Sequence, residues 1–318
     1  MGTSLPVLTP DHTAPAKRTS SNLAGGVTCP YPRRVQARTM VLLAGLAASG
    51  AGAAAEPPPG GIPDLTGPRA LALAGTAGVP GGNDAIFENP AALGARKRYS
   101  VDALFFTDER EAGNAGQYFG GSVVDSMTGP VAAAFAYQRA TEGTYTGNLY
   151  RLAISVPVSE GLFLGAGSTY FDVEGPRPST AASVDAGLFW QVARYLSLGA
   201  VGKNLVPIAN EAIAPMGMAA GLAVGSDASL TVAAEWSAEF PEAGGTTNRY
   251  AGGIEYLLMN LVPLRAGYAF DEKLDTQWWS AGAGVVTRTV ALDAAYRQSL
   301  DATSARTIVV AVRFFPFQ

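Results

Sequence analysis

The residues best suited to chemistry are acids and bases that recur at alternate positions, mostly late in the chain. They are Glu235, Glu255, Arg265, Asp293 and Arg297, with Lys203 and Arg151 in earlier segments of the same kind. Two carboxylates held close together can perform general acid–base catalysis, whereas mixed acids and bases can build an ion network. Whether these side chains form a catalytic pair or an ion network therefore depends on the secondary-structure elements that carry them.

Histidine and cysteine are almost missing from this chain of 318 residues. His12 and Cys29 are its only examples, and both lie in the first tenth. A Ser–His pair, a disulfide framework and a zinc site of several His or Cys ligands are therefore excluded from the rest of the chain. The formal net charge of −4 does not suit a nucleic-acid binder. We expect no enzyme activity, no metal, no cofactor and no nucleic-acid partner.

The chain from about residue 99 onward reads as a series of short strands. Segments rich in Val, Leu, Ala, Tyr and Phe are separated by Gly, Pro, Asp, Asn and Ser, without helical periodicity. The fourteen predicted strands are 99–107, 117–126, 130–140, 148–157, 162–172, 181–192, 195–204, 216–225, 229–239, 249–258, 263–271, 276–286, 289–299 and 305–315.

The two faces of these strands differ in residue size. In the segment 263–271 one face carries Leu264, Tyr268 and Phe270, and the other carries Arg265 and glycine or alanine. Large apolar residues on one face and small or polar residues on the other are typical of a membrane barrel with a narrow polar lumen. A soluble sheet with these aromatics in its core remains the alternative. We predict an all-β, transmembrane antiparallel barrel of about fourteen strands, over residues 99–318.

Residues 1–55 read as a signal peptide with an over-long start. Arg33, Arg34 and Arg38 precede an apolar stretch, Met40 to Ala55, that ends in three alanines before Glu56. Sixteen residues rich in Ala and Gly are short for a spanning helix. Cleavage after Ala55 leaves 17 basic and 25 acidic residues, a net charge of −8, and neither Cys nor His. We therefore expect export to the bacterial outer membrane.

The segment between the signal and the first strand carries a family resemblance. GPRALALAGTAGVPGGNDAIFENPAALG, within residues 62–98, resembles the N-terminal region of FadL-type fatty acid transporters and their PorV/PorQ-type relatives. Later stretches resemble the last strands of this group in order, among them GGIEY, PLRAGYAFDE, SAGAGV and ALDAAYRQSL. The resemblance is closest to the PorV/PorQ-type branch. It implies a 14-stranded barrel with an N-terminal hatch at 56–98, and we call these residues the hatch segment.

The resemblance also suggests which residues hold the hatch segment. Its motif residues are Asp84, Asn89, Pro90 and Ala91. Because the residue before a proline avoids the helical conformation, Asn89 interrupts the segment, and its amide is free to bond to the barrel wall. An ordinary turn or helix start is the other interpretation. The alternating acids and bases face the lumen, where they either anchor the hatch segment and line a polar path or satisfy one another in a filled barrel.

Three functions follow as expectations. The resemblance implies transport of small hydrophobic molecules across the outer membrane, with membrane lipid around the barrel and a hydrophobic ligand inside it. The alternative is a PorV-like non-conducting barrel that serves secretion-system proteins or surface attachment, and a plugged structural barrel is a third reading. Substrate and oligomeric state do not follow from the sequence.

Overall fold

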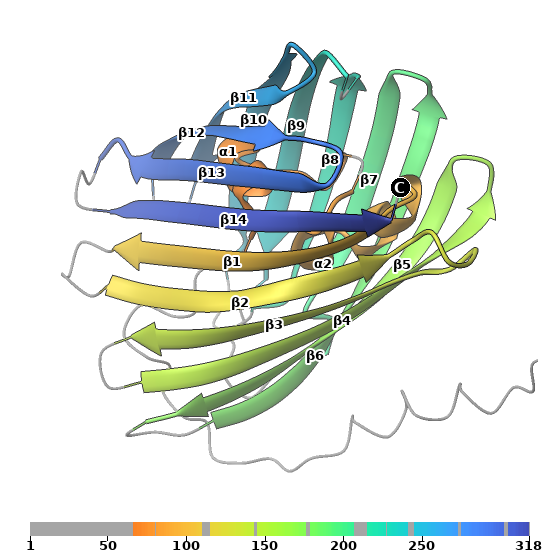
Figure 1. Ribbon diagram of the computed structural model, residues 1–318. Coiled ribbons are helices and arrows are strands. Elements are labelled where there is room, and N and C mark those ends of the chain that lie inside the picture. Colours follow the sequence, from red (N-terminus) through yellow and green to blue (C-terminus); the bar gives the residue numbers. More distant parts are fainter. Residues whose placement is uncertain are drawn as a thin grey trace, which may run out of the picture. The chain divides into compact units, whose positions relative to one another are not determined.

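The described part of the chain is a closed antiparallel β-barrel of fourteen strands with three short helices inside it (Figure 1). This computed structural model describes residues 66–79, 81–109, 115–142, 145–175, 179–206, 215–226, 228–240, 245–272, 275–301 and 305–317. The predicted signal peptide, with His12 and Cys29, lies outside these residues. No helix in the described ranges has the length and apolar character to cross a membrane.

Each strand pairs with its two neighbours in chain order, and β1 pairs with β14 to close the ring. All fourteen predicted strands are confirmed, with ends that shift by at most three residues. The strands are β1 (Tyr99–Glu109), β2 (Ala115–Asp125), β3 (Ala132–Glu142), β4 (Tyr145–Ser159), β5 (Leu162–Glu174), β6 (Ser179–Ala193), β7 (Leu196–Lys203), β8 (Gly217–Gly225), β9 (Leu230–Glu239), β10 (Thr247–Leu258), β11 (Val262–Asp271), β12 (Thr276–Val286), β13 (Val290–Ser299) and β14 (Arg306–Phe317).

The barrel wall sorts residues by size, as the alternation predicts. Leu230 and Val232 of β9 are exposed on the outside, whereas Thr231 and Ala233, which alternate with them, are buried. Large apolar side chains are exposed around the wall, from Phe119 on β2 to Leu292 on β13. The buried face is mostly alanine, serine, threonine and glycine, which leaves room for the hatch segment within the ring.

The described part of the hatch segment, residues 66–79 and 81–98, contains three short helices, and the sequence explains where each begins or ends. Helix α1 (Pro68–Leu73) begins with proline, whose fixed φ suits a first helical position, and ends at Ala74 in the left-handed conformation. Helix α2 (Ala85–Glu88) ends at Asn89, which is extended before Pro90. The 3-10 helix η1 (Pro90–Ala95) follows at once, and the Asn89 side chain accepts a hydrogen bond from its Ala91 N–H.

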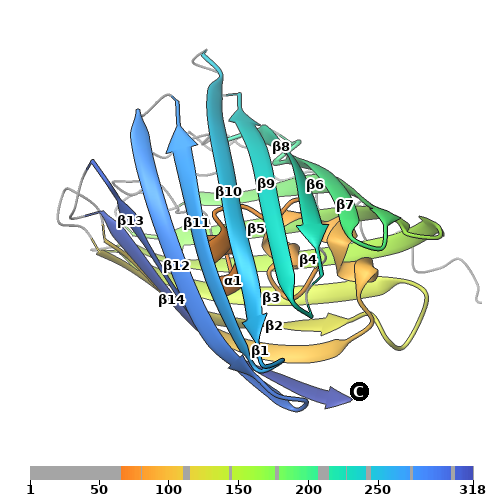
Figure 2. The same cartoon turned by 90° about the horizontal axis from the view of Figure 1, so that it is seen from above.

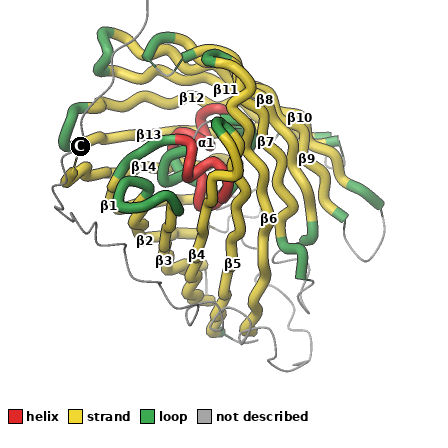
Figure 3. The backbone as a smooth tube through the Cα atoms, turned by 90° about the vertical axis from the view of Figure 1, so that its right-hand side faces the viewer, coloured by secondary structure: helices red, strands yellow, loops and turns green. Residues whose placement is uncertain are grey.

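These helices lie inside the ring of strands and contact opposite walls (Figures 2 and 3). Helix α1 packs against β10–β14, whereas η1 packs against β3–β6. The turns after even-numbered strands are short, such as 259–261 between β10 and β11. We call the barrel end with these turns the short-turn end, and the hatch segment enters β1 there.

Candidate functional site

Asn89 ties the hatch segment to one wall by neutral hydrogen bonds. Its side chain is fully buried, and its Nδ2 donates to the carbonyl of Ala77 at 3.0 Å and to that of Leu188 on β6 at 3.1 Å. The same amide caps η1 through its oxygen, so one residue meets three backbone groups. Asn89 is thus both a helix start and a wall contact.

Wall serines extend this neutral contact. Ser155 on β4 donates to the carbonyl of Ala91 at 2.7 Å, and Ser197 on β7 donates to that of Gly78 at 2.7 Å. These side chains are almost fully buried. The small polar face of the strands therefore supplies the partners that the irregular backbone of the hatch segment needs.

Wall glycines bring the hatch segment into backbone contact. A Cβ added at Gly199 on β7 would lie 1.6 Å from the Ala77 carbonyl oxygen, and one at Gly187 on β6 would lie 2.2 Å from Asn89 Oδ1. A Cβ added at Gly165 on β5 would likewise lie 2.2 Å from the backbone N of Ala91. No side chain fits at these positions without displacing the segment.

The opposite wall adds charges to neutral contacts of the same kind, such as the hydrogen bond of 2.9 Å that Ser280 of β12 donates to the Ala72 carbonyl. Arg69 of α1 binds Glu255 of β10 with both ends of its guanidinium, Nη2 to Oε1 at 2.6 Å and Nε to Oε2 at 3.0 Å. Arg265 of β11 donates to the same Glu255 at 2.5 Å and to Asp293 of β13 at 2.7 Å. All four side chains are largely buried. These contacts form a continuous chain of ion pairs from α1 to β13.

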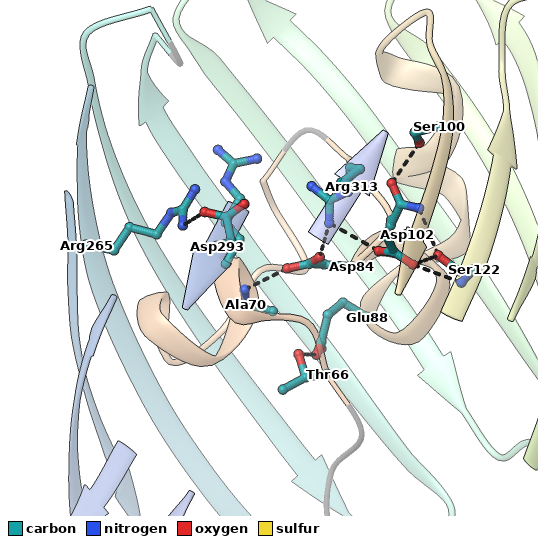
Figure 4. Close-up of polar contacts among 12 residues, drawn as sticks. Thr66, Ala70, Asp84, Glu88, Ser100, Asp102, Ser122, Arg265, Asp293 and Arg313 are labelled. Carbon is teal, nitrogen blue, oxygen red and sulfur yellow. Dashed lines mark hydrogen bonds and ion pairs between the residues drawn. The ribbon is translucent and has the colours of Figure 1, made fainter. Parts of the chain in front are cut away.

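Asp84 and Arg313 form a second ionic contact beside the first (Figure 4). Arg313 of β14 lies 3.2 Å from Asp84 and 3.4 Å from Asp102 of β1. Asp84 also accepts from the backbone N–H of Ala70 at 3.0 Å, and Asp102 accepts from Ser122. Asp84 therefore joins α1, the start of α2 and the seam where the barrel closes.

The remaining predicted lumen residues lie apart from this network. Glu235 accepts from the Ala77 N–H at 2.6 Å, Arg151 pairs with Asp185, and Arg297 donates to Thr307 at 3.2 Å. Lys203 reaches Glu88 at the end of α2, at 3.2 Å. The sequence analysis placed these residues in one lumen network, whereas in the structure each of them has its own separate partner.

Glu235 and Glu255, the acids of β9 and β10 that could have formed a close carboxylate pair, are not neighbours. Glu255 stands opposite Thr231 and Arg265, whereas Glu235 stands opposite Ala251. They are four positions apart along the β9–β10 ladder, or about 13 Å. In the described ranges, no group of three or more His, Cys, Asp or Glu side chains is placed to hold a metal ion.

The sequence interpretation missed Arg69, Asp102 and Arg313. Asp102 and Arg313 fall on the inward face of the first and last strands, where the same alternation rule identifies them. Arg69 lies in a short helix without periodicity, so only its position next to Pro68 marks it.

A cavity of about 530 Å³ lies between the hatch segment and the β10–β14 side of the barrel. Arg69, Glu255, Arg265, Asp293 and Arg313 all line it. It extends to Met127 and Asn260, exposed residues of the turns at the short-turn end. We call this cavity the chamber.

The fold is that of the FadL-type barrels. The solved toluene transporter TbuX of Ralstonia pickettii matches with a TM-score of 0.63 and 14% identity, over 79% of this chain and 98% of that chain. A FadL homologue of Pseudomonas aeruginosa matches with a TM-score of 0.59 and 13% identity, over 79% and 98%. The Pseudomonas putida toluene transporter TodX matches with a TM-score of 0.57 and 12% identity, over 80% of this chain and 99% of that chain.

At these identities the likeness is one of fold. No protein-family model matches the sequence, and no curated protein matches it. The closed barrel of fourteen strands predicted from the alternation and from the FadL resemblance is therefore confirmed, whereas the PorV/PorQ-type branch stays a prediction.

Proposed function

We propose that this protein is an outer-membrane barrel through which small hydrophobic molecules pass. The observation that carries the proposal is a closed barrel of FadL-type fold whose lumen holds both the hatch segment and the chamber. Toluene transporters are among the solved barrels with this fold. A cavity of about 530 Å³ is within the usual range for small-molecule pockets.

The outer surface supports a membrane location. Phe119 is 64% exposed and Leu222, Leu264 and Leu292 are more than 40% exposed, all on strands that span the wall. An apolar band around a closed barrel is stable in lipid, where every backbone group must be paired within the protein. The apolar exterior therefore fits lipid as the surrounding partner.

The wall supports an axial route rather than a lateral one. Strand β3 pairs with β2 from Gly116↔Glu142 to Asp125↔Ala133 and with β4 from Ala132↔Ser155 to Glu142↔Tyr145, without a register shift. A continuous ladder leaves no side opening at this strand. Solute that reaches the lumen would leave by the chamber at the short-turn end, which we assign to the periplasmic side.

The barrel itself is tested by gel mobility of the detergent-purified protein, unheated and boiled, together with cell fractionation. A closed barrel resists SDS until heated, because every strand edge is paired. We expect a heat-dependent shift and recovery in the outer-membrane fraction. A soluble periplasmic protein without a shift would refute the membrane assignment and the transport role with it.

Transport is tested by toluene uptake in cells that lack their own FadL-type transporter. We expect uptake several-fold above that of cells making an unrelated outer-membrane barrel at the same level. Uptake equal to that control would overturn the transport proposal. Copurification of secretion-system proteins in that case would favour the non-conducting alternative.

The signal peptide is tested by the intact mass of the outer-membrane protein. We propose cleavage after Ala55, so that the mature chain begins at Glu56. A protein of the full 32.7 kDa in that fraction would contradict the cleavage.

A further inference from the structure

A row of tyrosines crosses the outer face of the barrel near the end opposite the short turns, which we call the outer end. Tyr137 of β3, Tyr150 of β4 and Tyr170 of β5 stand opposite one another in the strand register. Their ring centroids are 5.2 Å and 6.2 Å apart. Aromatic rows of this kind mark the boundary between the hydrocarbon and the headgroups of a membrane.

The outward residues of β3–β6 differ on the two sides of this row. Toward the short-turn end, the next outward pair is Phe135 and Leu152, which are 44% and 49% exposed. Toward the outer end, the outward residues in the described part of these strands are all polar. They are Thr141, Arg139, Asn148, Thr146, Asp172, Glu174 and Thr180. We call these residues the polar band.

The polar band is taller than the headgroup layer of a phospholipid leaflet. Thr141 and Glu174 lie four positions beyond Tyr137 and Tyr170. Four positions correspond to about 13 Å along a strand, or roughly 10 Å of height at the usual strand tilt. The polar layer of one phospholipid leaflet measures roughly 5–7 Å. A larger headgroup is needed to cover the band.

The band belongs to the side of the barrel with the longer strands. Strands β4 and β6 have 15 residues each, whereas β7 and β8 have 8 and 9. Near the outer end of β7 and β8, Gly202 and Met218 face each other on the outside, and Met218 is 42% exposed. The band is therefore a local surface and not a uniform rim, which points to a specific partner.

Arg139 supplies the positive charge of the band. Its side chain is exposed, and within the described part of the chain no hydrogen bond or ion pair engages its guanidinium group. It stands opposite Asn148, whose amide oxygen accepts a hydrogen bond of 2.8 Å from the Tyr137 hydroxyl. The carboxylates of Asp172 and Glu174 lie on β5, one strand beyond Asn148. Because guanidinium donates in a planar fork, it suits the oxygens of a phosphate.

We propose that the polar band docks the phosphorylated sugar headgroup of a lipid of the outer leaflet. Arg139 contacts the phosphate, and the amide of Asn148 and the hydroxyl of Thr141 meet sugar hydroxyls. The carboxylates on β5 repel the phosphate and so keep it at β3. The inference rests on the outer-membrane location and the orientation in the proposed function, and it does not depend on transport.

The test is native mass spectrometry of the detergent-purified protein mixed with equal amounts of two lipids. One is lipid A, whose headgroup is a phosphorylated disaccharide, and the other is phosphatidylglycerol, which has a phosphate without a sugar. We expect the occupancy of lipid A to exceed that of phosphatidylglycerol at least fivefold. The Arg139→Gln variant should lower the occupancy of lipid A at least fivefold, and so should removal of the phosphates from lipid A. Equal occupancy of the two lipids, or unchanged occupancy in Arg139→Gln, would overturn the proposal.

The matched control is Arg194→Gln. Arg194 is also exposed, but it lies in the turn between β6 and β7 at the short-turn end, 5.1 Å from the Tyr195 ring. This change removes the same charge from the other end of the barrel, so we expect the occupancy of lipid A to stay at the wild-type level. An equal loss in both variants would mean that net charge alone attracts the lipid, and would overturn the proposal.

A second variant tests the place of the phosphate without removing Arg139. Thr141 is exposed on the same face, two positions further toward the outer end, so Thr141→Glu puts a carboxylate beside the phosphate. We expect a loss of lipid A occupancy of a few fold that shrinks in high salt. Heat-dependent gel mobility verifies that each variant is a folded barrel. Wild-type occupancy in a folded Thr141→Glu protein would contradict a phosphate at this position.

The outcomes separate this inference from the proposed function. A heat-dependent barrel that takes up toluene but has no preference for lipid A refutes this inference alone. A preference for lipid A in a protein that does not raise toluene uptake refutes the transport proposal alone.

Discussion

The two walls that hold the hatch segment share neutral backbone contacts but differ in charge, since Ser280 and Gly253 also meet the segment on the β10–β14 side. On the β4–β8 side, Asn89, wall serines and glycines such as Gly199 meet the backbone of the segment in neutral, close contact. On the β10–β14 side, Arg69 and Asp84 meet the wall through buried ion pairs. The chamber lies on the charged side.

The additional charges of the β10–β14 side line the chamber. Backbone contacts across glycine occur on both sides, at Gly199 of β7 and at Gly253 of β10. The ion pairs are also contacts at hydrogen-bond distance, but their long side chains line the cavity beside α1. Both walls therefore hold the backbone of the segment, and the ion pairs of the β10–β14 wall also form part of the cavity lining.

The largest effect should come from Glu255→Gln. This change leaves Arg69 and Arg265 buried without their shared carboxylate, and breaking a buried pair in this way costs about 3–5 kcal/mol. The measurement is urea unfolding of the barrel in lipid vesicles. Glu109→Gln removes a carboxylate from an exposed pair and is the control. A Glu255→Gln protein as stable as this control would show that the charged wall does not hold the segment.

The next effect tests the neutral wall. Gly199→Ala places a Cβ against the Ala77 carbonyl, where backbone must move, and overpacking of this kind costs about 1–3 kcal/mol. We expect a lower unfolding midpoint and faster proteolysis of the hatch segment. Gly252→Ala is the matched control, since its Cβ meets only the Ala233 carbonyl oxygen at an ordinary 3.5 Å. Equal behaviour of the two variants would contradict close contact at β7.

The contrast between the walls also decides what the sequence could reveal. The alternation of small and large residues identified all fourteen strands and the inward side of Glu255, Arg265 and Asp293, because a pleated strand has a period of two. It could not identify Arg69 or the glycine contacts. These depend on where a short, aperiodic segment lies in the lumen, which no local pattern encodes.

The alternation of residues along the strands also could not predict which charged side chains pair with one another. Glu235 and Glu255 share an inward face, but the ladder register separates them, and Arg297 falls beside Thr307 instead of an acid of that cluster. Which inward residues meet depends on register and on groups from the hatch segment. The motif around Asn89 was more informative, because proline at position 90 dictates the local backbone.

An effect of similar size is expected at Asn89 itself. Asn89→Ala leaves the Ala77 and Leu188 carbonyls without their amide donor, at a cost of about 2 kcal/mol in unfolding free energy. Asn89→Asp keeps an acceptor for the Ala91 N–H but loses both donated bonds. We therefore expect both variants to be destabilised in the same unfolding assay. Wild-type stability of Asn89→Asp would mean that only the cap on η1 matters.

The smallest effect should come from Lys203→Met, which tests whether charge matters on the neutral side. Lys203 of β7 reaches Glu88 at 3.2 Å, and its side chain is 32% exposed. A partly exposed pair contributes little, so we expect a loss below about 1 kcal/mol. Because salt screens such a pair, the difference in unfolding free energy from wild type should vanish in 1 M NaCl, where the Debye length is roughly 3 Å. A loss as large as that of Glu255→Gln, or one that persists in salt, would show that both walls depend on buried charge and would remove the contrast between them.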